Sequence, residues 1–192
     1  MKEQQNGCLI GVIVAIVAAV ILLLFPVGCY NSIVSSDEAI DAAWAQVETV
    51  LQRRYDLIPN LVNTVKGFAD QEKAVLTEVT ALRSQWAKAG TVAEKARAAT
   101  GLEAALGRLM VISERYPELK SNQNFLRLQD ELAGTENRVS VERRRYNETV
   151  RRYNVTVRKL PGKIVANIAG FEERDVYFEA ASGAETAPVV EF

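Results

Sequence analysis

Residues 122–160 read NQNFLRLQDELAGTENRVSVERRRYNETVRRYNVTVRKL and carry the clearest helical pattern in this chain of 192 residues. Apolar and aromatic residues return at every seventh position along it, at Phe125, Leu132, Val139, Tyr146, Tyr153 and Leu160. Such a repeat is typical of a helix that packs along its whole length against other helices. Ser121-Asn122 offers an N-cap, and Leu160-Pro161-Gly162 ends the pattern. This stretch therefore predicts one long helix with one buried face.

The preceding sequence predicts another long helix. One apolar stripe with seven-residue spacing starts at Ile40 and reaches Leu82, and a second stripe beside it runs from Trp44 to Trp86. Both stripes keep their phase across Pro59. We therefore expect a single helix that is kinked at Pro59, with a complete break there as the alternative.

Turn residues separate these two helices from a third. Ala89-Gly90-Thr91 is expected to end the first, with its glycine in the left-handed conformation past the C-cap. A further helix is expected near Ala93–Tyr116, and strand patterns are nearly absent before residue 163. The predicted fold is all-α: a single N-terminal transmembrane helix, then an antiparallel bundle of three to four long helices, with a short C-terminal tail.

The transmembrane prediction rests on Cys8–Val27, CLIGVIVAIVAAVILLLFPV. No charged side chain occurs from Gln4 to Ser36, and the quoted segment spans about 30 Å as a helix, the thickness of a bilayer's hydrocarbon core. Three regions follow from this pattern: a membrane anchor (1–30), a helical-bundle domain (31–171) and an acidic, partly mobile tail (172–192).

Two forms of the anchor fit the sequence. We favour a retained transmembrane helix; the alternative is a signal peptide cut before Cys29, which would then carry lipid. Lys2 precedes the apolar segment and the first basic residue after it is Arg53, which predicts a single-pass protein with its soluble domain outside the cytoplasm. Small residues at a spacing of four suit close helix–helix contact in a homo-oligomer; the alternative is that glycine and alanine are simply common in membrane helices. The residues at this spacing are Gly7, Gly11, Ala15 and Ala19.

Composition excludes several kinds of site. The chain has no histidine, and its two cysteines, Cys8 and Cys29, both flank the apolar segment. A Ser-His-Asp or Cys-His site, an imidazole zinc site and thiol chemistry in the domain are therefore excluded. The formal net charge of −1 gives no general attraction to nucleic acid. We expect no enzyme activity, no cofactor and no metal.

Three charged residues interrupt the apolar stripes: Arg54, Glu72 and Glu142. Because a buried unpaired charge costs on the order of several kcal/mol, each must find a partner or reach water. The first interpretation is that such pairs fix the helix register. The second is a functional cluster around Arg53-Arg54-Tyr55-Asp56, in which carboxylates would do acid–base work.

The charge along the chain is segregated. Basic residues outnumber acidic ones from Asn122 to Leu160, and the reverse holds from Pro161 onward. Arg144, Arg151 and Arg158 recur every seventh residue and form a basic ridge. This ridge is either a solvated face partly neutralised by the acidic tail, or a docking surface for an acidic partner or anionic lipid.

Several motifs resemble the LemA family of bacterial membrane proteins. The most specific is RRYDLIPNLV at residues 53–62, followed by ERYPELKSN at residues 114–122. The remaining matches are Tyr30-Asn31, Ala43-Trp44 with Val47, Val65-Lys66-Gly67-Phe68, Phe125, Thr135-Glu136-Asn137-Arg138, Arg145-Tyr146-Asn147 and Tyr153-Asn154. Phe68 departs from the tyrosine that the family often has. The likeness extends from the anchor to Phe171.

The resemblance implies an N-terminal membrane anchor followed by a helical bundle. The family includes a magnetosome-associated member and others encoded near membrane proteases, and it supplies no catalytic residues to carry over. Our leading hypothesis is a membrane-anchored, non-enzymatic scaffold that binds other envelope proteins and itself. The alternatives are an anionic-lipid-binding protein that uses the basic ridge, and a lipoprotein processed at Cys29.

Overall fold

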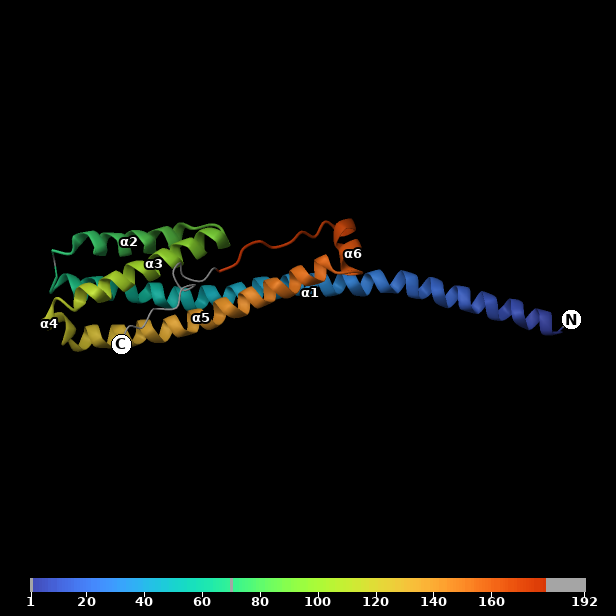
Figure 1. Ribbon diagram of the computed structural model, residues 1–192, viewed down its shortest axis with the longest axis horizontal. Helices are drawn as coiled ribbons and strands as arrows, with labels where there is room; N and C mark the ends of the chain where they lie inside the picture. The colour runs from blue at the N-terminus through green and yellow to red at the C-terminus, as the bar shows by residue number, and fades with distance from the viewer. Residues whose placement is uncertain (1, 70, 179–192) are drawn as a thin grey trace, which may run out of the picture. The chain divides into compact units, whose positions relative to one another are not determined.

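The computed structural model describes residues 2–69 and 71–178; up to residue 22 it describes the backbone and the side chains of Ile13, Ile16 and Val20 alone. Within these ranges the regular structure is entirely helical, as predicted. The helices are α1 (Lys2–Lys66), α2 (Lys73–Lys88), α3 (Val92–Ser113), α4 (Pro117–Lys120), α5 (Gln123–Arg158) and α6 (Gly162–Ala169), shown in Figure 1.

The chain divides into two compact units. The first, which we call the α6 unit, combines residues up to Asp41 with Glu148–Asp175. The second, the bundle unit, combines Ala42–Asn147 with the chain from Val176 onward. Helices α1 and α5 each contribute one part to each unit.

The bundle unit packs parts of α1 and α5 with α2 and α3, joined by short connections that make successive helices antiparallel (Figure 1). Its core is formed by the predicted apolar stripes, whose side chains are almost completely buried. They include Val47, Leu51, Ile58, Val79, Leu102, Leu109, Phe125 and Val139. The expectation of long helices with facing apolar seams is confirmed here.

The prediction of one continuous helix from Ile40 to Ala89 is wrong. Helix α1 ends at Lys66 and α2 begins at Lys73. Gly67 follows the end of α1 and weakens the helix, because glycine gains more freedom on unfolding than other residues. Phe68, placed on the buried stripe by its spacing, is 39% exposed, whereas Ala69 is 1% exposed. The stripes keep their phase across a loop, so periodicity does not reveal the break.

The turn between α2 and α3 lies where it was predicted, but its conformation differs from the predicted one. Helix α2 ends with Ala89 in an extended conformation, and the following glycine, Gly90, does not have a positive φ angle. Instead, Thr91 caps α3: its side chain accepts a hydrogen bond from the Glu94 amide, and the Glu94 carboxylate accepts one from the Thr91 amide. This reciprocal pair is a capping box.

Helix α1 continues through Pro59, so the alternative of a complete break there is wrong. A proline has no amide hydrogen, and its presence therefore frees the carbonyl of the residue four positions earlier. That residue is Tyr55, and the structure supplies a replacement donor from α2. The Arg83 Nε atom donates to the Tyr55 carbonyl over 3.3 Å.

The α6 unit contains a helix that the sequence did not predict. After α5, the chain turns at Leu160-Pro161 and forms α6, whose C-cap is Gly170 with φ 78°. Gly162 lies so close to α5 that a Cβ atom there would approach the Thr156 carbonyl oxygen to 2.2 Å. Phe171 then contacts the Tyr30 ring of α1, with the ring centroids 5.7 Å apart.

Among the side chains that the structure describes, no helix combines the length and the apolarity that crossing a membrane requires. The small-residue ladder lies outside these described side chains, as does most of the predicted span. The ladder consists of Gly7, Gly11, Ala15 and Ala19.

A double-mutant cycle tests the Pro59–Arg83 relation. We expect Arg83→Met to lower the free energy of unfolding of the bundle unit by about 1 kcal/mol, the net value of one hydrogen bond. In a Pro59→Ala background the new amide donates a hydrogen bond to the Tyr55 carbonyl. Arg83→Met should then leave the free energy of unfolding almost unchanged. Urea unfolding in detergent, followed by the fluorescence of Trp44 and Trp86, measures both. Equal costs in the two backgrounds would exclude the relation.

Candidate interaction site

The most buried charge of the bundle unit is Arg54, which is 6% exposed. Its Nη1 atom pairs with the Glu136 carboxylate of α5. The neighbouring Tyr55 lies 1% exposed and stacks on Trp86 of α2, with ring centroids 4.3 Å apart and planes 17° apart. One turn of α1 thus contacts α5 through a charge and α2 through an aromatic ring.

Several buried donor atoms around this turn have no hydrogen-bond partner among the described residues. They are Arg54 Nε, Tyr55 Oη, Trp86 Nε1, Arg143 Nε and Arg143 Nη2. Burial raises the pKa of Tyr55 well above its usual range, although the positive charges of Arg54 and Arg143 oppose this. The Tyr55 hydroxyl therefore keeps its proton at physiological pH.

The other two residues of the predicted cluster lie elsewhere. Arg53 and Asp56 are exposed, and Asp56 accepts a hydrogen bond from Gln52 Nε2 over 2.7 Å. Consecutive helical residues point in different directions, so the four adjacent residues do not converge on one point.

The remaining charges on the predicted stripes are also paired. Glu72 lies at the N-cap of α2, where its Oε1 atom accepts hydrogen bonds from Arg115 Nη2 (2.9 Å) and the Tyr116 hydroxyl (3.1 Å). Glu142 pairs with Arg145 over 2.8 Å, one turn along α5. Arg54, Glu72 and Glu142 thus each have a different partner.

The predicted basic ridge is partly neutralised where it lies in the α6 unit. Arg151 and Arg152 both pair with Glu148, at 2.9 Å and 3.1 Å. Arg158 lies 3.6 Å from Glu173. The ridge in this unit thus meets carboxylates both of α5 itself and of the segment after α6. Arg144, in the bundle unit, is exposed.

The segment after α6 is held to α5 through its backbone. Asn154 binds Arg174 twice: its Nδ2 donates to the Arg174 carbonyl and its Oδ1 accepts from the Arg174 amide, both at 2.9 Å. The Tyr153 hydroxyl donates to the Glu172 carbonyl over 2.8 Å. The Arg174 side chain reaches Asp37 of α1 at 2.9 Å.

The bundle unit repeats this arrangement with Asn147. Its side-chain amide donates to the Phe178 carbonyl over 2.8 Å and accepts from the Phe178 amide over 2.9 Å. The Phe178 ring lies 5.9 Å from Trp44 and 5.7 Å from Tyr146, and the Arg143 guanidinium lies 5.0 Å from it. We call Asn147 and Asn154 the asparagine clamps.

The asparagine clamps are binding residues that the reasoning from sequence missed. A signal is present, because Arg-Arg-Tyr-Asn occurs twice, at residues 144–147 and 151–154. The arginines of this repeat suggest a basic ridge, whereas its last residue, asparagine, carries no charge and gives no comparable indication of a binding role. The tyrosines occupy the buried face and the asparagines stand beside it, where a side-chain amide can bind a passing backbone.

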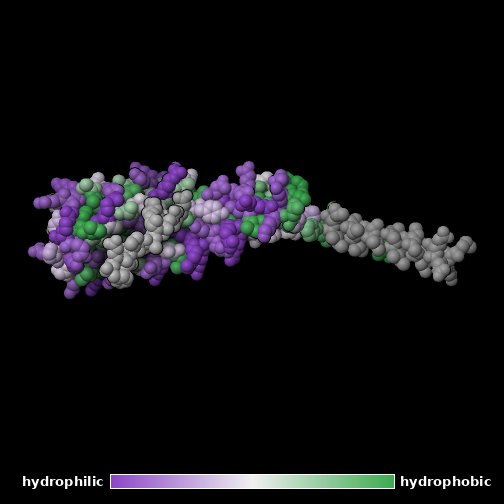
Figure 2. All heavy atoms as spheres, in the orientation of Figure 1, coloured by the Kyte–Doolittle hydropathy of each residue, from purple (hydrophilic) through white to green (hydrophobic). Residues whose placement is uncertain are grey.

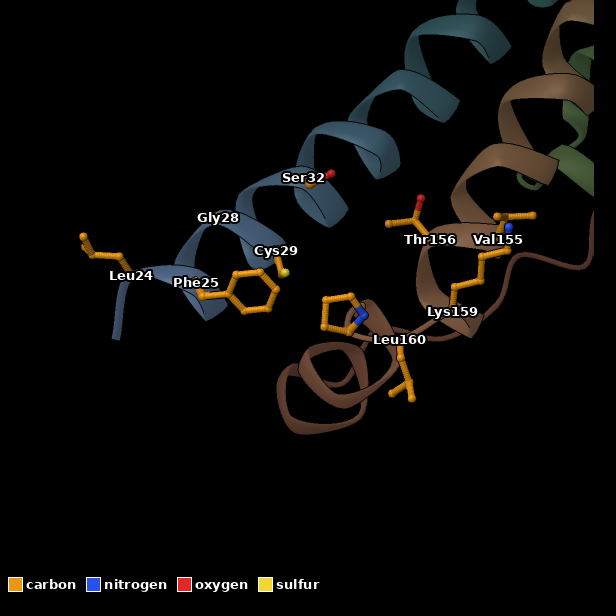
Figure 3. Close-up of a pocket in the computed structure, with 11 residues that line it drawn as sticks. Leu24, Phe25, Gly28, Cys29, Ser32, Val155, Thr156, Lys159 and Leu160 are labelled. Atoms are coloured by element: carbon orange, nitrogen blue, oxygen red, sulfur yellow. The ribbon is translucent and has the colours of Figure 1, made fainter. Parts of the chain in front are cut away.

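A pocket of about 440 Å³ lies in the α6 unit between the first part of α1 and the turn from α5 to α6. Figure 3 shows Phe25 and Cys29 of α1 facing this turn, which carries Lys159 and Leu160. Cys29, the residue considered for lipid attachment, is half-buried here with a free thiol. The lining is mostly apolar.

The model of the LemA family matches residues 43–192. The chain belongs to the LemA family. The match includes Arg54, Tyr55, Glu136 and both asparagine clamps, and it confirms the family named from the sequence motifs.

This LemA-family chain is also similar to curated magnetosome proteins. Two MamQ proteins of Paramagnetospirillum magneticum are 26% identical to it over 89% of this chain and 71% of their own length. Magnetosome protein MamQ of Magnetospirillum gryphiswaldense is 27% identical over 80% of this chain and 66% of its own length. These names describe the relatives.

The Tyr55 hydroxyl gives a first test of whether this site is structural. Because Tyr55 Oη has no partner among the described residues, Tyr55→Phe should change the free energy of unfolding by less than about 0.5 kcal/mol. Tyr55→Ala, which also removes the ring stacked on Trp86, should cost about 3–5 kcal/mol. Urea unfolding followed by tryptophan fluorescence compares them. A large loss in Tyr55→Phe would show that the hydroxyl has an essential partner.

Asn154 gives a test of the clamps. Asn154→Ala removes two hydrogen bonds, worth about 2 kcal/mol together, and should expose the Arg174 peptide bond about 30-fold more often. Limited trypsin digestion, with mass spectrometry of the fragments, measures cleavage after Arg174. Asn137→Ala, at an exposed position on α5, is the matched control and should cleave at the parent rate. Unchanged cleavage in Asn154→Ala would contradict the clamp.

Proposed function

We propose that this LemA-family chain is a membrane-anchored, non-enzymatic helical scaffold of the bacterial cell envelope. The observation that carries the proposal is the use of its motif residues. Arg54 and Glu136 join α1 to α5, and the asparagine clamps bind the segment after α6. These side chains hold one part of the chain to another, which is the work of a rigid support.

The chemistry of the buried site favours the same function. The Tyr55 hydroxyl stays protonated, and the Arg54 guanidinium is already engaged by Glu136. General acid–base catalysis needs a group whose pKa lies near the working pH and that can reach a substrate.

Membrane attachment is proposed from the sequence of the first part of α1. Cys8–Val27 is uncharged and long enough to span a bilayer, and several of its described side chains are highly exposed. Exposed large apolar side chains in a row are costly in water and favourable in lipid. A retained single-pass helix, with the soluble units outside the cytoplasm, is the form we propose; the lipoprotein processed at Cys29 remains its rival.

A scaffold acts through its partners. We propose that these are other envelope proteins and a second copy of this chain, whose contact would involve the small-residue ladder from Gly7 to Ala19. The similarity to magnetosome proteins supports a role beside membranes.

Alkaline carbonate extraction of membranes tests the anchor. We expect the full-length chain to stay in the membrane pellet and to dissolve only with detergent, whereas an Ile16→Lys, Val20→Lys variant should be released, since each central lysine costs about 3 kcal/mol. Crosslinking in intact membranes then identifies neighbours that persist at high salt. Release of the parent chain by carbonate, or conversion of a substrate by the purified chain, would contradict the proposal.

A further inference from the structure

Helix α6 carries an apolar face that nothing in the described structure covers. Gly162 and Ala166 are buried, whereas Ile164 is 56% exposed and Ile168 is 83% exposed. These two isoleucines lie one turn apart and share one face of the helix. Leu160, immediately before α6, is 71% exposed. Figure 2 shows the resulting hydrophobic patch at the position of α6.

The residues that line the pocket of the α6 unit show which part of α1 lies beside the start of α6. Its lining joins Leu160, Pro161 and Gly162 to Phe25 and Cys29. Phe25 belongs to the last turn of the predicted membrane span, and Cys29 lies just beyond that span. Helix α6 therefore begins at the level where α1 would leave the hydrocarbon core of a bilayer.

Part of α1 at the same level is apolar and exposed. Leu23, Leu24, Phe25 and Val27 are each more than half exposed. These residues, the two exposed isoleucines of α6 and Leu160 just before it make up a set of exposed apolar side chains in the α6 unit. We call this set the apolar collar and define it as Leu23, Leu24, Phe25, Val27, Leu160, Ile164 and Ile168. A collar of this kind, interrupted by the mostly apolar pocket, matches the acyl-chain side of a membrane interface.

Two lysines border the collar. Lys159 lines the pocket, and Lys163 lies on α6 between the exposed apolar positions. Lysine side chains beside an apolar face reach the headgroup region of a bilayer and attract anionic phosphates. Positive charge thus lies beside the apolar collar, a combination that suits anionic phospholipids.

We propose that the α6 unit seats itself on the bilayer: helix α6 lies in the membrane interface, and acyl chains of bilayer phospholipids pack against the apolar collar and enter the pocket between α1 and the α5–α6 turn. This inference rests on the proposed membrane anchor. It adds a second lipid contact, which fixes the orientation of the α6 unit on the surface. The anchor alone would leave that orientation free.

Quenching by brominated lipids tests the proposal. The full-length chain carrying Ile168→Trp is placed in vesicles of phosphatidylglycerol and phosphatidylcholine brominated near the headgroup end of the acyl chains. We expect the emission added by the new tryptophan to be quenched, and more strongly than with bromine at the methyl end. Emission from Trp44 and Trp86 is subtracted with the parent protein. Leu160→Trp, at the mouth of the pocket, provides a second variant and should behave alike.

The matched control is Val111→Trp, at an apolar position on α3 in the bundle unit that is 71% exposed, as Leu160 is. Its emission should be unaffected by bromine. If the tryptophans added by Ile168→Trp and Leu160→Trp are not quenched while the chain still resists carbonate extraction, the collar proposal is overturned and the anchor stands. Release by carbonate overturns both. Blue-shifted but unquenched emission from the Ile168→Trp variant would show that protein, a second copy for example, covers the collar and would also overturn the proposal.

Discussion

Backbone amides and carbonyls that a helix cannot pair must find other partners when they are buried, and this constraint explains the most distinctive residues of the chain. Pro59 frees the Tyr55 carbonyl, and Arg83 binds it. The segment after α6 has no neighbouring strand among the described residues, so Asn147 and Asn154 supply both a donor and an acceptor to its backbone. Motif residues that suggest chemistry in the sequence thus complete the hydrogen bonding of the fold.

The helices with unbroken heptads were predictable, because the buried face of a helix requires apolar residues at regular intervals in the sequence. Helix α5 begins directly after the expected Ser121-Asn122 cap, where the Asn122 Oδ1 atom accepts a hydrogen bond from the Phe125 amide. The break after Lys66 could not be predicted in this way. The loop preserves the phase of both apolar stripes, so the seven-residue spacing continues across it as it would in a helix. Helix α6 is too short for periodicity and has no side-chain cap to announce its start.

The contacts of the candidate site join residues that lie far apart along the chain. A local sequence pattern does not show which distant residues meet. Arg54 is recognisable as a charge that needs a partner, but Glu136 lies 82 positions away and nothing in its sequence context distinguishes it from the other glutamates. The asparagine clamps escape notice because asparagine beside a helical seam usually faces water. The repeated Tyr-Asn pair is recognisable in the sequence. Its role in binding a backbone depends on the path of the segment after α6, which the sequence does not reveal.

The two units differ in how they handle apolar surface. In the bundle unit, exposed large apolar side chains such as Val111 and Leu126 stand apart on different helices, as they do on most soluble proteins. In the α6 unit, Leu24 and Phe25 of α1 line the same pocket as Leu160, and the exposed Ile164 and Ile168 follow Leu160 along α6. Water penalises a contiguous apolar area in proportion to its size, and lipid removes that penalty. The burial that the α6 unit lacks is therefore of the kind that a bilayer supplies, whereas the bundle unit completes its core with its own helices.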